Sequence, residues 1–125
     1  MEFKRTGNSK AALDLGGYSF STLKPGAILQ SKKFFGITKN GVFRGYHNSY
    51  VSFSRGQYLV VTKITRSPYN FPSIEGWKAT RLDTAQEYAN GIKNDLDKAP
   101  MWVKHVNLHE ITKRKFDNRF EIIQA

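Results

Sequence analysis

The chain has 125 residues and a formal net charge of +10, with 39% hydrophobic and 14% aromatic residues, a composition typical of one globular domain rather than a disordered segment. It has no cysteine, which excludes disulfides, thiolate metal sites and a cysteine nucleophile. No apolar run approaches the roughly 20 residues that cross a bilayer, and the first charges are not followed by the apolar run of a secretory signal. We therefore expect a cytoplasmic protein of a cell or an infected host.

The first half of the chain is expected to be rich in short strands. A polar lead-in, residues 1–17, precedes Tyr18, and glycine and proline then mark turns every few residues. Asn40-Gly41 is a strong type I′ hairpin signal. The expected strands are Ala27–Phe35, the hairpin strands Phe34–Lys39 and Val42–His47, and then Tyr50–Phe53 and Gln57–Thr65.

The second half is expected to contain one helix between strands. Ser67–Gly76 carries two prolines and predicts a loop. Asp83 or Thr84 can cap a helix that ends near Lys98, and with Thr84 as N-cap Glu87 completes a capping box. The remaining segments predict a strand at Trp77–Leu82, a strand at Trp102–Ile111, a turn at Lys113-Arg114-Lys115 and a last strand at Phe116–Ile123.

These elements predict an α+β fold. We expect a small, strongly bent antiparallel β-sheet or partial SH3-like barrel, with one covering helix and a C-terminal β-hairpin. In the rhythm of its turns, Lys24–Ile64 resembles SH3-like and KOW-type small barrels. The whole chain, 1–125, is expected to be a single domain with a lead-in (1–17), a basic β-rich half (18–74), and a part with a strand, the helix and the terminal hairpin (75–125).

The positive charge is concentrated in the β-rich half. No acidic residue occurs between Leu15 and Ile74, whereas that segment holds eight cations and 11 of the 17 aromatic residues. From Glu75 to the last residue the chain is nearly balanced, with nine basic and eight acidic residues. Cations interleaved with aromatic rings can follow a phosphate backbone and stack on bases, although aromatic residues are also favoured in strands as core.

We therefore expect a nucleic-acid-binding domain without catalysis or cofactor, which would contact the backbone of DNA or RNA. The candidate cations are Lys32, Lys33, Lys39, Arg44, Arg55 and Lys63, and the candidate stacking rings are Tyr46 and Tyr50. The cluster Lys113-Arg114-Lys115 could also contact phosphates, or be a solvated turn. The alternative is a small accessory or phage-encoded protein whose lysines bind and modulate an acidic host protein.

The histidines do not predict a metal site. His105 and His109 lie in an expected strand, where four residues span roughly 13 Å. Two imidazoles that far apart cannot share one zinc ion. No phosphate-binding glycine loop or nucleophile elbow is present, and the basic half has no pair of carboxylates.

A third interpretation comes from the segment Gly76-Trp77-Lys78-Ala79-Thr80, followed by Ala85 and Tyr88-Ala89. It resembles the glycine–aromatic–Thr and A-x-x-Y-A segment of ADP-ribosyltransferases. The resemblance implies NAD as substrate, with His47 as the first-strand histidine and Glu110 as the catalytic glutamate. That family has a helix soon after its histidine, whereas Tyr50–Thr65 predicts strand, so we do not expect the chain to be an enzyme.

Overall fold

The computed structural model describes residues 22–38, 43–44, 51–66, 68, 70–93 and 103–125. In chain order the elements are β1 (Ile28–Ser31), β2 (Phe35–Ile37), β3 (Phe43–Arg44), β4 (Val51–Phe53), β5 (Tyr58–Thr65), β6 (Ser73–Ala79), α2 (Leu82–Lys93), β7 (Lys104–Leu108), α3 (Lys113–Arg119) and β8 (Phe120–Gln124).

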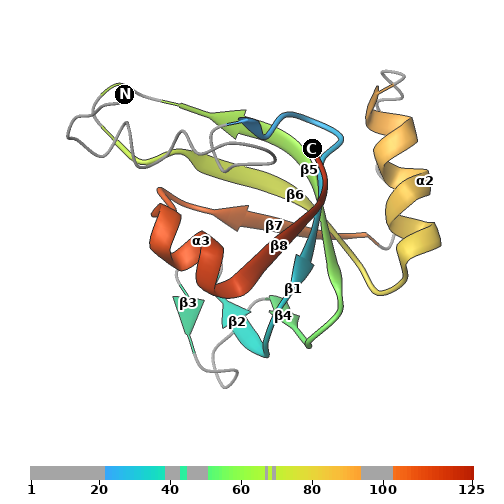
Figure 1. The fold of residues 1–125 in the computed structure, drawn as a ribbon, viewed down its shortest axis with the longest axis horizontal. Coiled ribbons are helices and arrows are strands. Elements are labelled where there is room, and N and C mark those ends of the chain that lie inside the picture. The colour runs from blue at the N-terminus through green and yellow to red at the C-terminus, as the bar shows by residue number, and fades with distance from the viewer. Residues whose placement is uncertain (1–21, 39–42, 45–50, 67, 69, 94–102) are drawn as a thin grey trace.

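The strands form two antiparallel sheets. The larger has five strands in the order β7-β6-β5-β1-β8, and the smaller has the order β3-β2-β4. Figure 1 shows α2 on one side of the twisted large sheet and α3 with the small sheet on the other. The expected α+β class with a bent antiparallel sheet is confirmed, and the described strands form a partial barrel without closing it.

The larger core lies between the two sheets and α3. It contains Leu29 and Leu59 of the large sheet, Phe53 of the small sheet, and Phe116 and Phe120 around α3. Phe35 stacks on Phe53 with ring centroids 5.3 Å apart and meets Phe120 edge-on at 5.3 Å. The expected strand Ala27–Phe35 therefore breaks in two, so that β1 stays in the large sheet while Phe35 begins the small one.

A second, smaller core lies under α2. Ala85 and Ala89 of the helix are fully buried against Ile28 and Val60. Tyr88 and Ile92 pack beside them, with Tyr88 edge-on to Trp77. The expected capping role of Thr84 is wrong. The helix begins earlier, at Leu82, because the carbonyl of Arg81 already accepts the Ala85 N–H, and Thr84 lies in the first turn.

The C-terminal third differs most from expectation. The prediction of a C-terminal β-hairpin is wrong. The strand β7 pairs with β6 and the strand β8 pairs with β1, at opposite edges of the large sheet. A second helix, α3, replaces the turn expected at Lys113-Arg114-Lys115. Its N-cap is Thr112, whose side chain accepts the Lys115 N–H. The loop expected over Ser67–Gly76 ends early, since β6 begins at Ser73.

Candidate nucleic-acid interface

The first part of the candidate site is the bend Lys32-Lys33-Phe34 between β1 and β2. All three side chains are exposed. The bend is held at its start by α3, because the Lys32 N–H donates to the carbonyl of Arg119 (2.8 Å) and Lys32 Nζ donates to the carbonyl of Asp117 (2.8 Å). It is held at its end by Phe35, which is buried between Phe53 and Phe120. The bend is therefore anchored on both sides.

The second part is the turn between β4 and β5, which presents Arg55 to solvent. Gly56 has a φ of 89°, a conformation that side-chain-bearing residues rarely adopt, and its N–H donates to the carbonyl of Ser31 (2.9 Å). The Ser31 N–H in turn donates to the carbonyl of Gln57 (2.8 Å). Because Ser31 directly precedes Lys32, these bonds place Arg55 beside the Lys32-Lys33 bend.

The third part is α3, which carries Lys113, Arg114 and Lys115. Lys113 forms an ion pair with Asp117 one turn later, and the carbonyl of that same Asp117 accepts the bond from Lys32. Arg114 and Lys115 are exposed. The short helix thus adds its cations to those of the bend.

We name the cations of these three connected segments the basic corner. Its members are Lys32, Lys33, Arg55, Lys113, Arg114 and Lys115. Two acidic residues lie close to these cations in the chain: Asp117 in α3, and Glu121 in β8, which follows α3. Arg119 packs under the corner, with its guanidinium 5.9 Å from the centre of the Phe35 ring. Burial lowers the pKa of Arg119, but a guanidinium still carries its charge at neutral pH.

The structure brings together only part of the residue set expected from the sequence. Lys32, Lys33 and Arg55 meet in the basic corner. Lys63 does not, because it lies five residues along β5 from Tyr58, roughly 17 Å away at the spacing of a strand. The backbone of Arg44, in β3, pairs with Gly36. Lys39, Tyr46 and Tyr50 lie outside the described residues.

Sequence reasoning did not single out Phe34, which the structure places in the bend of the basic corner. Among the described large hydrophobic side chains Phe34 is the most exposed, at 54%, and it follows the two lysines directly. The signal was the pair Phe34-Phe35. Neighbouring residues of an extended chain face opposite ways, so one ring of such a pair reaches the core and the other faces outward.

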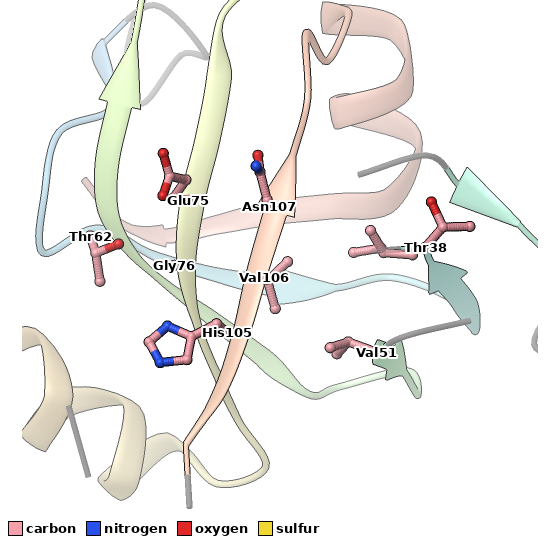
Figure 2. A pocket seen from close by; sticks show the side chains of 9 residues that line it. Thr38, Val51, Thr62, Glu75, Gly76, His105, Val106 and Asn107 are labelled. Carbon is pink, nitrogen blue, oxygen red and sulfur yellow. The ribbon is translucent and has the colours of Figure 1, made fainter. Parts of the chain in front are cut away.

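A second feature is a hollow of about 230 Å³ that straddles the edge strand β7. Figure 2 shows Glu75, His105 and Thr62 on one side of this strand and Val51 and Thr38 on the other. Glu75 is the one carboxylate among the described lining residues, so they supply no pair of carboxylates. We assign the hollow no reaction.

The two histidines expected not to share a metal lie at different places. His105 is on β7, edge-on to Trp77, and His109 is in the turn after β7, 3.3 Å from the carboxylate of Glu110. Within the described ranges, no three histidine, aspartate or glutamate side chains are placed to hold one metal ion.

The residues that resemble ADP-ribosyltransferases do not gather into one site. Trp77 and Tyr88 meet near the end of β6 that leads into α2. Glu110 lies at the other end of β6, where its N–H donates to the side chain of Ser73. Seven residues of extended strand, roughly 23 Å, separate Ser73 from Thr80. His47 lies outside the described residues.

None of the helices described is both long and apolar enough to cross a membrane. Compared with models of protein families, with curated proteins and with solved structures, the chain gives no match.

Proposed function

We propose that the chain is a non-catalytic nucleic-acid-binding domain and that the basic corner is its contact with the phosphate backbone. The observation that carries the proposal is that hydrogen bonds join three cation-bearing segments, distant in sequence, at one end of β1. Phosphates attract such a cluster over several ångströms, and each neutralised phosphate releases a counterion.

The way in which the corner is built supports the proposal beyond net charge. Backbone hydrogen bonds from Ser31, Lys32 and Gly56 tie the bend to the β4–β5 turn and to α3. The cations therefore start from fixed backbone positions, which lowers the entropy lost when they bind. Arg55 and Arg114 add planar guanidinium groups that can grip a phosphate with two hydrogen bonds.

The test compares two double variants with the same net charge. Lys33→Ala with Arg55→Ala removes two cations of the basic corner. Lys24→Ala with Lys63→Ala removes two exposed cations from the opposite end of β1 and β5, where the Gly26 N–H donates to the carbonyl of Val61. Binding to duplex DNA is measured by fluorescence anisotropy between about 50 and 200 mM salt.

With about four or five phosphate contacts, the slope of log K against log salt is expected near −4 for the wild type. The corner variant should make that slope shallower by about one or two units, and the control variant should leave it unchanged within experimental error. Equal losses in both variants would show that net charge alone acts. Absence of any DNA or RNA binding at about 50 mM salt would refute the proposal and favour an acidic protein partner for the same cations.

A further inference from the structure

Phe34 occupies an unusual position for a large apolar side chain. It is 54% exposed, lies directly after Lys32 and Lys33, and is followed by Phe35, which is 6% exposed. More than half of the Phe34 side chain is open to solvent, and two adjacent lysines bring an anionic ligand to it.

The segment that carries this ring is held in place. On one side Lys32 is bonded to the last turn of α3, through the carbonyls of Asp117 and Arg119. On the other side Phe35 stacks on Phe53. The backbone of Phe34 therefore needs no ordering when a ligand arrives, and the loss of entropy is confined to its side chain.

We infer that the basic corner takes single-stranded nucleic acid in preference to duplex, and that Phe34 is the platform on which an unpaired base stacks. This inference rests on the proposed function and names its ligand class. Bases inside a duplex are covered by their neighbours, so a ring on a surface bend can stack only on a base that is unpaired or splayed out. The cations of the corner hold the flanking phosphates while the ring covers the base.

The experiment uses the full chain, an oligo(dT) of about 12 nucleotides, which is within the range that single-strand sites occupy, and a mixed-sequence duplex of the same length. Three substitutions are made at one position: Phe34→Ala, Phe34→Leu and Phe34→Trp. Leucine keeps an apolar side chain without a flat π face, and tryptophan keeps the π face. Phe71→Ala is the matched control, because Phe71 is 43% exposed and precedes the other end of the large sheet, at Ser73.

The wild type is expected to bind oligo(dT) more tightly than the duplex. Phe34→Ala and Phe34→Leu should weaken oligo(dT) binding by about 5- to 100-fold and change duplex binding by less than about two-fold, whereas Phe34→Trp and Phe71→Ala should bind as the wild type does. Circular dichroism melts of all variants exclude loss of fold as the cause.

The outcomes separate this inference from the proposed function. If the wild type binds both ligands with the salt dependence given above but Phe34→Ala leaves oligo(dT) binding unchanged, the stacking platform is refuted and the backbone contact stands. Equal or tighter wild-type binding of the duplex likewise overturns the preference for single strands. If neither ligand binds at about 50 mM salt, both proposals fall.

Discussion

The ammonium group of Lys32 donates a hydrogen bond to the backbone carbonyl of Asp117, 85 positions later in the chain. The bond joins the end of β1 to the last turn of α3, whose carbonyl groups have no partner within the helix. A cation at the C-terminal end of a helix is also favoured by the helix dipole. One lysine thus links the two most basic segments of the described structure.

Replacement of Thr112 should loosen α3. The Thr112 side chain accepts the Lys115 N–H at 3.2 Å, and α3 has only 7 residues, so one cap is a large share of its local stabilisation. Thr112→Ala should lower the free energy of unfolding by about 1 kcal/mol, and Thr112→Ser should retain most of it. Chemical denaturation measures the loss. Unchanged hydrogen exchange of the Lys115 amide in Thr112→Ala would contradict the capping role.

A methyl group at Gly76 should strain the large sheet. A Cβ atom built at this position would meet the backbone oxygen of Val60 on β5, next to the bulge between Val61 and Lys63. Backbone cannot move aside as a flexible side chain can. Gly76→Ala is therefore expected to destabilise the fold by about 1–3 kcal/mol, measured by urea denaturation. A midpoint equal to that of the wild type would show that the strands separate without cost.

Lys78 should titrate below the ordinary lysine value of 10.5. Its pKa is lowered mainly by burial and also by the nearby charge of Lys104, while its Nζ donates to the carbonyl of Ser52 at 2.6 Å and lies 5.6 Å from the centre of the Phe53 ring. Lys104→Gln removes the second cause and should raise the pKa of Lys78. NMR titration of the Lys78 Cε resonance measures the pKa, and Lys24→Gln, which removes a distant charge, should leave it unchanged.

The same lowered pKa makes stability depend on pH. Between the folded pKa of Lys78 and 10.5 the unfolded chain binds more protons at this residue than the folded chain does. The contribution of Lys78 to the free energy of unfolding therefore rises as the pH rises through that window. The rise should be absent in Lys78→Met. A difference between wild type and Lys78→Met that stays constant up to pH 10.5 would contradict the shift.

The elements that the sequence predicted best are those with strong local signals. The run of β-branched and aromatic residues in β5 predicted a strand almost at its observed bounds, Tyr58–Thr65. A hairpin is expected around Asn40-Gly41, and β2 does pair antiparallel with β3, at Gly36–Arg44 and Ile37–Phe43. This register is one residue away from that of a two-residue turn at Asn40-Gly41, and the turn itself lies outside the described residues. Both patterns depend on neighbours in sequence.

The elements that the sequence missed depend on distant contacts. In α3 the one fully buried side chain is Phe116, so the helix has no apolar periodicity, and its ring packs on Phe120 at 5.8 Å. The pairing of β8 with β1 joins opposite ends of the chain. The basic corner depends on the same distant contacts. Charge counting found Lys32, Lys33 and Arg55, but it could not separate them from Lys63 or join them to Lys113.

Removal of the acid within the basic corner should strengthen binding. Asp117→Asn removes one negative charge and the ion pair with Lys113, but it keeps the backbone carbonyl that Lys32 uses. The lost ion pair should cost about 0.3–0.5 kcal/mol of stability, a small amount for a pair one helical turn apart. Lys113 then becomes available for a phosphate, and this additional contact should tighten binding several-fold. It should also steepen the slope of log K against log salt by about 0.9 on duplex DNA.

The matched control for Asp117→Asn is Glu87→Gln, which changes the net charge equally on an exposed residue of α2, on the other side of the large sheet. Salt titrations of wild type and both variants are compared on the same duplex. A steeper slope for Asp117→Asn alone would show that the corner itself meets the phosphates. An equal gain in both variants would mean that only the overall charge of the protein matters.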